Sequence, residues 1–148
     1  MKLSLVIPCY NEEEVLPITA PLFLAQRDLL IQKEKISPES KILFVNDGSK
    51  DNTSKVLREA FDMHPVRRPL KRQVPCKDVE TIYECFTEKV PLVLIRKVNG
   101  GKADALNMGI NASHYPYFIC MDADSVLQAD SLIRITRPIL ENEDIVAV

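Results

Sequence analysis

The chain has 148 residues, of which 46% are apolar and 27% are charged, so it is long enough for one hydrophobic core and short for two. Its net charge of −2, from 19 basic and 21 acidic residues, supplies no broad positive field and disfavours binding to nucleic acid. No apolar run approaches the roughly 20 residues of a membrane helix, and the first residues lack a signal-peptide pattern, so we expect one soluble, unprocessed domain.

Short apolar runs rich in β-branched residues alternate along the chain with segments of helical character. The runs are continuous, which is typical of strands covered on both faces of a sheet. The predicted strands are residues 3–8, 41–46, 92–96 and 117–121, with a last apolar run at 145–148. The predicted helices are residues 17–35, 52–63, 102–113 and 130–141. This order predicts an α/β fold with a mostly parallel sheet, helices on both faces and right-handed crossovers.

Residues 63–91 form the least regular stretch. They contain four prolines and a cluster of basic residues, and we interpret them as an irregular, solvated insertion that wraps the edge of the sheet. A substrate-facing basic arm is the less favoured alternative. Within this stretch, residues 78–86 predict a short helix with Val79, Ile82 and Phe86 turned inward.

Polar residues cluster where each of the four predicted strands ends. The clusters are residues 8–12, 46–49, 99–102 and 122–124. In open parallel sheets, ligands bind beyond the carboxyl ends of the strands, near a switch in strand order. We therefore expect these clusters to form one site.

Asp122 and Asp124 are separated by one residue directly after a predicted strand, so extended backbone places both carboxylates on the same side. Two such groups repel each other unless a cation lies with them, and Mg²⁺ or Mn²⁺ completed by phosphate oxygens suits this pair. The alternative is that Asp124 only caps the turn that follows.

Asp47 and Lys102 suggest the two ends of a nucleotide. Asp47 ends a predicted strand and can accept hydrogen bonds from a base or a ribose. Lys102 follows Gly100 and Gly101 at a predicted helix start, where a cation, free backbone N–H groups and the helix dipole suit a diphosphate. The chain has no GxGxxG, complete P-loop, GxSxG or HExxH motif, which argues against dehydrogenases, P-loop NTPases, α/β-hydrolases and zinc peptidases.

Four ordered motifs carry a family resemblance. They are VIPCYNEEEVLP at 6–17, LFVNDGSKDNT at 43–53, NGGKADALNMGI at 99–110 and FICMDADSVL at 118–127. Together they resemble the donor-binding half of a family 2 glycosyltransferase with the Rossmann-like GT-A fold. The opening motifs are similar to polyprenyl-phosphate glycosyltransferases. The later ones are similar to membrane polysaccharide synthases of the poly-N-acetylglucosamine, chitin and hyaluronan kind, and are more diagnostic.

The resemblance implies roles for individual residues. The first motif implies that Pro8, Tyr10 and Glu12 border the nucleotide, and the second that Asp47 contacts its uracil. The third implies that Lys102, Asp104 and Asn107 line the diphosphate pocket. The fourth implies that Asp122 lies near the ribose and diphosphate and that Asp124, with Asp122, holds the metal. Asn46 departs from the Asp-Asp pair that is frequent in the family, although it is the second member that normally meets the base.

The resemblance also implies an activity: inverting, metal-dependent transfer of a sugar to a polysaccharide or lipid-linked acceptor. UDP-N-acetylglucosamine or UDP-glucose is the expected donor, with GDP-mannose less favoured, and Mn²⁺ or Mg²⁺ is the expected cofactor. The alternatives are a non-catalytic nucleotide-sugar binding domain or inactive fragment and, more distantly, a phosphoacceptor switch domain that uses Asp47 with Lys102.

Family members place the acceptor-activating aspartate well after the second carboxylate of the DxD motif, and processive members add a QxxRW element and membrane helices. We therefore expect residues 1–148 to be a single, truncated donor-binding domain without the acceptor-side half. The general base is expected beyond Val148, and membrane contact only through parts absent from this chain. The expected location is the cytoplasm or the cytoplasmic face of a membrane.

Overall fold

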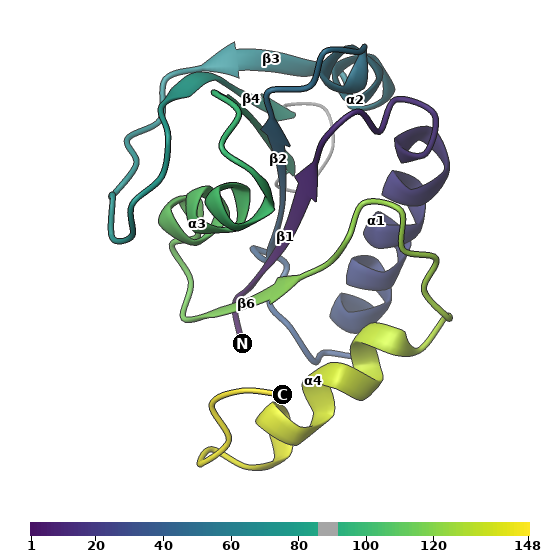
Figure 1. Ribbon diagram of the computed structural model, residues 1–148. Coiled ribbons are helices and arrows are strands. Elements are labelled where there is room, and N and C mark those ends of the chain that lie inside the picture. The colour runs from purple at the N-terminus through teal and green to yellow at the C-terminus, as the bar shows by residue number, and fades with distance from the viewer. Residues whose placement is uncertain (86–91) are drawn as a thin grey trace.

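The computed structural model describes residues 1–85 and 92–148 (Figure 1). Along the chain its elements are β1 (Leu3–Cys9), α1 (Leu16–Gln32), β2 (Lys41–Asp47), α2 (Thr53–Phe61), β3 (Met63–Val66), β4 (Val79–Cys85), β5 (Leu92–Lys97), α3 (Lys102–Ala112), β6 (Tyr117–Cys120) and α4 (Ser131–Glu141). The helices expected at 17–35, 52–63, 102–113 and 130–141 and the four main strands are thus confirmed, with boundaries shifted by a few residues.

The strands form one sheet in the order β3-β4-β5-β2-β1-β6. β1 pairs in parallel with β2 and β6, and β2 pairs in parallel with β5. Cys9 lies opposite Asn46, which in turn lies opposite Arg96, so the carboxyl ends of β1, β2 and β5 reach the same edge of the sheet. The prediction of a mostly parallel sheet is confirmed, and its strand ends converge as expected.

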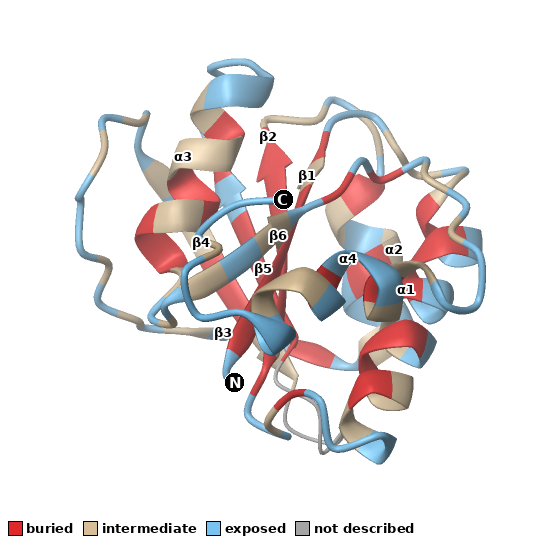
Figure 2. Cartoon of the chain, turned by 90° about the horizontal axis from the view of Figure 1, so that it is seen from below, coloured by how far each residue is buried: buried red, intermediate tan, exposed pale blue. Residues whose placement is uncertain are grey.

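Helices cover both faces of the sheet (Figures 1 and 2). On one face, α3 packs Ala105 and Met108 against inward side chains of the parallel strands such as Val45. On the other face, α1, α2 and α4 contribute Phe23, Leu57 and Leu132 to a second cluster. Both layers of apolar side chains are removed from water, which explains why the strand sequences are continuous apolar runs.

The helix expected over residues 78–86 is wrong: β4 runs through them as a strand. It pairs antiparallel with both β3 and β5. Ile82 and Tyr83 are adjacent and both buried, yet they pack in the clusters on opposite sides of the sheet, which is the period of a strand rather than of a helix. Phe86, the third residue expected to face inward, lies outside the described residues.

Part of the expected insertion is therefore sheet. Pro65 lies within β3 opposite Tyr83, and it is tolerated because β3 is an edge strand of the described sheet. The irregular part is the segment 67–78, which links β3 to β4 and lies beside α3 (Figure 1). We call it the 67–78 loop.

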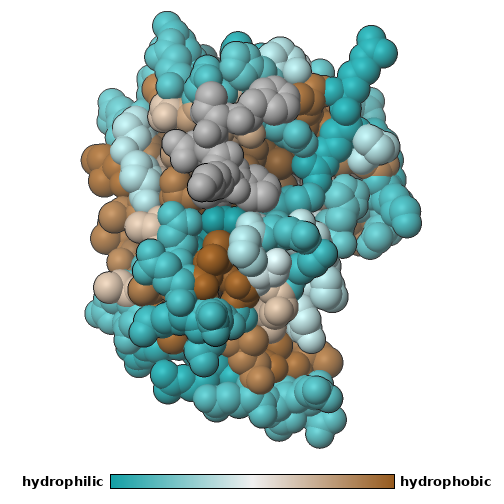
Figure 3. All heavy atoms as spheres, turned by 180° about the vertical axis from the view of Figure 1, so that it is seen from behind, coloured by the Kyte–Doolittle hydropathy of each residue, from teal (hydrophilic) through white to brown (hydrophobic). Residues whose placement is uncertain are grey.

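The last apolar run, 145–148, does not add a strand. Val146 and Val148 are 86% and 69% exposed, and this segment borders an apolar groove beside β6 without pairing with it. The face opposite to that of Figure 1 shows apolar areas separated by hydrophilic side chains (Figure 3). In the part of the chain that the structure describes, no helix is both long and apolar enough to cross a membrane.

Candidate functional site

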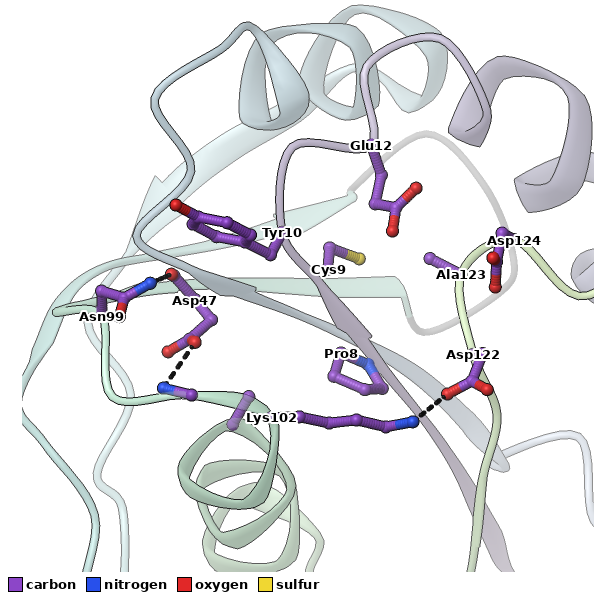
Figure 4. Close-up of a pocket in the computed structure, with 12 residues that line it drawn as sticks. Pro8, Cys9, Tyr10, Glu12, Asp47, Asn99, Lys102, Asp122, Ala123 and Asp124 are labelled. Carbon is purple, nitrogen blue, oxygen red and sulfur yellow. Dashed lines mark hydrogen bonds and ion pairs between the residues drawn. The ribbon is translucent and has the colours of Figure 1, made fainter.

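The carboxyl ends of the parallel strands enclose a cavity of about 550 Å³ (Figure 4). Seven of the predicted site residues line it: Pro8, Tyr10, Glu12, Asp47, Lys102, Asp122 and Asp124. They come from the ends of β1 and β2, the start of α3 and the turn after β6. A cavity of this volume is within the usual range for small-molecule sites.

The turn after β1 is held by the loop between β2 and α2. Asn11 adopts a left-handed φ of 51°, and its backbone N–H donates to the Ser49 hydroxyl at 2.9 Å. The Glu12 N–H donates to the Thr53 hydroxyl, also at 2.9 Å. Asn46 supports this loop by accepting from the Ser49 N–H at 3.1 Å. The residue that departs from the family pattern therefore braces the turn beside the cavity.

Asp47 is buried and accepts from three donors. Its Oδ1 accepts from Lys97 Nζ at 2.5 Å and from the Gly100 N–H at 2.9 Å. Its Oδ2 accepts from the Gly101 N–H at 2.8 Å. Gly101 has φ +95°, which L-residues with a side chain rarely adopt, so glycine is what allows the loop to aim this N–H at the carboxylate.

The opposite end of the cavity is more exposed. Lys102 Nζ donates to Asp122 Oδ1 at 2.5 Å, and the two side chains are 64% and 54% exposed. This hydrogen bond, together with the charge of Asp122, raises the pKa of Lys102. Lys102 is the first residue of α3, so its ammonium lies near the positive end of that helix.

Negative charge accumulates around Glu12. Its carboxyl pKa is raised, first by burial and then by the charges of Asp124, Asp51 and Asp122. Within the described residues no side chain donates to Asp124, whereas Asp122 has Lys102. This side of the cavity therefore carries acidic charge that the protein itself compensates only in part.

Two of the predicted site residues do not line the cavity. Asp104 accepts from the Lys77 N–H at 3.1 Å and pairs with Lys97 Nζ at 2.6 Å. Asn107 donates to the Pro75 carbonyl at 3.0 Å. Both side chains hold the 67–78 loop against α3, so the structure brings them beside the cavity wall rather than into the cavity.

Comparison with known proteins adds the family. The model of glycosyl transferase family 2 matches residues 4–74 and 77–148. The chain belongs to glycosyltransferase family 2. The matched ranges contain all the residues described above as lining the cavity.

Relatives of this family 2 chain are longer proteins. It is 30% identical over 146 residues to a poly-beta-1,6-N-acetyl-D-glucosamine synthase of Staphylococcus epidermidis, covering 99% of this chain and 27% of that protein. It is 29% identical over 129 residues to the synthase of the same name from Staphylococcus aureus strain COL, covering 87% of this chain and 23% of that protein. The chain thus spans about a quarter of the length of the curated relatives it matches.

Solved structures show the same fold. The crystal structure of S. aureus TarS 1–349 superposes with a TM-score of 0.62 at 18% identity, covering 97% of this chain and 33% of that one. A crystal structure of the same TarS fragment in complex with UDP matches equally well. The expected GT-A architecture of this family 2 chain is confirmed.

Three carboxylates line one side of this family 2 site. Asp122, Asp124 and Glu12 offer carboxylate oxygens, the ligands that Mg²⁺ and Mn²⁺ prefer, and after burial the charge of Asp124 is the main cause of the raised Glu12 pKa. Across residues 1–85 and 92–148, however, no group of three or more His, Cys, Asp or Glu side chains is arranged to hold a metal. A cation here would therefore need further oxygens from a ligand.

Sequence reasoning missed Lys97, which lies outside the polar clusters expected to form the family 2 site. Lys97 is fully buried under Asp47, and Asn99 donates its side-chain N–H to the Asp47 carbonyl at 2.8 Å. A Cβ on Gly48 would lie 2.8 Å from the Asn99 Cβ, so these two loops meet closely. The sequence shows Lys97 only as a lysine at the end of an apolar run. A solvent-exposed lysine at the end of a strand has the same pattern, so the sequence does not indicate that Lys97 is buried.

Proposed function

We propose that this chain forms the donor-binding part of a glycosyltransferase that takes a sugar from a UDP-sugar. The observation that carries the proposal is the single cavity that joins Asp47 and Tyr10 at one end to Lys102, Asp122 and Asp124 at the other. One end suits a base and the other suits a diphosphate, and the two belong to the same small-molecule-sized space (Figure 4).

The base end favours uracil over guanine. A carboxylate has about four acceptor positions, and Lys97, Gly100 and Gly101 occupy three of those of Asp47. The remaining position on Oδ2 matches the one imide N–H of uracil, whereas guanine presents two neighbouring donors. Tyr10 offers an aromatic face at the same end, on which a base can stack (Figure 4).

The diphosphate end combines Lys102 with the N-terminus of α3 and the two strand-end carboxylates. The ammonium and the helix N-terminus attract phosphate oxygens. Asp124 and Asp122 would hold Mn²⁺ or Mg²⁺, which would supply positive charge against the departing diphosphate. Lys102 has to leave Asp122 in part to reach the ligand, and its exposure permits that movement.

The names of the relatives support the wider reaction. The synthases are named for a poly-N-acetylglucosamine product, and one TarS structure contains UDP. We propose UDP-N-acetylglucosamine or UDP-glucose as the donor and a polysaccharide or lipid-linked acceptor. An acceptor hydroxyl would attack the anomeric carbon with inversion, its proton passing to a base, as the bond to the diphosphate breaks.

Calorimetric titration of the chain with UDP, GDP and UDP-N-acetylglucosamine, with and without Mn²⁺, tests the proposal. We expect UDP to bind more tightly than GDP, and Mn²⁺ to tighten the binding of both diphosphates. A folded chain that binds none of these nucleotides at millimolar concentration would contradict it. Release of UDP that depends on an added acceptor would then distinguish a transferase from a domain that only binds the donor.

A further inference from the structure

Lys97, the last residue of β5, is a charged side chain with no exposed surface. Its Nζ donates to Asp47 Oδ1 at 2.5 Å, to the carbonyl of Val98 at 2.7 Å and lies 2.6 Å from Asp104 Oδ2. An ammonium has three protons, and these three acceptors account for all of them. Lys97 therefore has no donor left for a ligand, and any influence on a ligand passes through the groups it holds.

The network around Lys97 joins three elements. Asp47 ends β2, Lys97 ends β5 and Asp104 lies in the first turn of α3. Burial alone would lower the pKa of Lys97, but its bonds to Asp104 and Asp47 outweigh burial and raise it. The ammonium thus stays charged between two carboxylates, beneath the glycine loop that leads into α3.

Stability alone does not account for such a network. Buried ion pairs lose much of their attraction to desolvation, and apolar residues of similar volume often serve stability as well or better. An apolar side chain at position 97 would, however, leave Asp47 Oδ1 without its strongest donor. What Lys97 adds to the two glycine N–H groups is a charged donor that occupies the second acceptor position of Asp47 Oδ1.

We propose that Lys97 is a positioning residue that determines which nucleobase the cavity accepts. This inference rests on the proposed function. Lys97 and the Gly100 N–H occupy Oδ1 of Asp47 and the Gly101 N–H occupies one position of Oδ2, so a single acceptor position is left on a carboxylate that lines the cavity. Without Lys97 the carboxylate can turn and offer one position on each oxygen, which matches the two neighbouring donors of guanine.

Two variants remove the positive charge at position 97, and two others retain Lys97. Lys97→Met removes the ammonium, while Lys97→Met combined with Asp104→Asn also removes the second carboxylate that the first change would strand. Asp104→Asn alone keeps Lys97 on Asp47. Arg96→Met is the matched control on the same strand, because Arg96 is 44% exposed and its nearest carboxylate oxygen, on Glu80, is 3.6 Å away.

The first measurement is the affinity for UDP and for GDP. In both variants without Lys97, we expect the preference for UDP over GDP to fall by about three- to tenfold, the range typical of one hydrogen bond. Asp104→Asn and Arg96→Met should keep the preference of the unaltered chain. Lys97→Arg, which restores a charged donor, should recover part of it.

The second measurement uses NMR to follow the loop of Gly100 and Gly101, whose N–H groups donate to Asp47. The chain has only four glycines, so ¹⁵N-labelled glycine gives one backbone N–H signal each for Gly48, Gly100, Gly101 and Gly109. Without Lys97 the signals of Gly100 and Gly101 should move, because both donate to Asp47. Gly109 packs against Val6 on the far part of α3 and should stay, which shows that the variant is folded.

The outcomes separate this inference from the proposed function. Failure of the unaltered chain to bind UDP overturns both. If that chain binds UDP and the folded variants without Lys97 keep its preference over GDP, only the role of Lys97 is overturned. An equal loss of preference in Asp104→Asn also overturns it, since Lys97 still holds Asp47 there. Should Lys97→Met not fold, the double variant decides by the same criteria.

Discussion

The two ends of the cavity differ in how their carboxylates are compensated. Asp47 is buried, 4% exposed, and receives three donors from the protein. Asp122 is 54% exposed with Lys102 as its partner, and Asp124 receives no side-chain donor within the described residues. The protein itself supplies the donors for Asp47 at the first end, whereas at the second end part of the acidic charge has no positive partner in the protein.

This difference matches what each end is proposed to bind. A base is neutral and is recognised by the direction of its hydrogen bonds, so a rigid acceptor is useful there. A diphosphate carries charge, and its site needs groups that can move between partners. Stability should therefore depend on the Asp47 end, while cation and salt effects should depend on the Asp122 end.

Asp47→Asn should have the largest effect on stability. The amide keeps the size of the side chain but removes the charge beside Lys97. Its NH₂ group cannot accept a hydrogen bond, so it leaves at least one of the buried donors around position 47 without an acceptor. We expect a loss of about 3 kcal/mol in the free energy of unfolding, the lower end of the range for breaking a buried ion pair, because Asp104 still contacts Lys97. Urea unfolding measures it.

Asp122→Asn is the matched control at the other end of the cavity. Its exposed pair with Lys102 should contribute little to folding, so the urea midpoint should stay close to that of the unaltered chain. Equal losses for the two variants would mean that the ends do not differ as the contacts indicate.

Asp124→Ala should abolish the effect of Mn²⁺ on UDP binding. Removing this carboxylate leaves Asp122 as the remaining strand-end ligand, already paired with Lys102. We expect the gain in UDP affinity on adding Mn²⁺ to fall by at least about tenfold, or 1.4 kcal/mol. Calorimetry with and without Mn²⁺ gives the ratio of the two UDP affinities. Asp130→Ala, an exposed aspartate outside the cavity lining, should leave it unchanged, and an unchanged ratio in Asp124→Ala would exclude Asp124 as a ligand.

The sequence predicted the parallel strands and most of the cavity lining. Continuous apolar runs identify strands covered on both faces, and parallel strands bring their carboxyl ends to one edge. Residues placed directly after those runs, such as Asp47, Lys102 and Asp122, were therefore predictable without any contact information.

The antiparallel part was not predictable by the same reasoning. β4 is covered on both sides, so Val79 and Ile82 fit the spacing of a helix face as well as the interior of a strand. The antiparallel pairing of β4 with both β3 and β5 decides in favour of the strand. The contacts of Asp104 and Asn107 with the 67–78 loop were not predictable either, because that loop has no sequence pattern of its own.

Arg96 and Lys97 show most clearly what the sequence alone cannot predict. They are neighbouring basic residues at the end of β5, and their side chains are 44% and 0% exposed. Which of them points toward Asp47 depends on the register of β5 against β2, where Asp47 lies opposite Lys97. That register is a property of the assembled sheet.

Lys102→Met should weaken UDP binding moderately and in a salt-dependent way. The ammonium is exposed, so its attraction for a diphosphate is screened, and we expect about a two- to fivefold loss at low salt that shrinks at high salt. Uridine, which has no phosphate, should bind both forms alike. Lys33→Met, an exposed lysine at the end of α1, controls for the loss of one charge. A loss that is independent of salt would show that Lys102 acts through packing instead.

Glu12→Gln should have the smallest effect, a gain in stability that depends on pH. The Glu12 pKa is raised above 4.5 in the folded chain by burial and by Asp124, Asp51 and Asp122. The folded state therefore binds this proton more readily than the unfolded state, and the free energy of unfolding falls as pH rises through the raised pKa. Glutamine cannot ionise, so the variant should melt at a higher temperature than the unaltered chain near neutral pH.

The gain should vanish below the unfolded pKa of 4.5, where Glu12 is protonated in both states. Mn²⁺ should also reduce it, because a cation beside Asp124 stabilises the ionised carboxylate. Melting curves across this pH range, with and without Mn²⁺, measure both effects. Glu14→Gln is the control, since Glu14 is exposed and outside the cavity lining. A Glu12→Gln chain that is less stable at neutral pH would mean that the ionised Glu12 is already compensated, and the proposed shortage of positive charge at this end would be wrong.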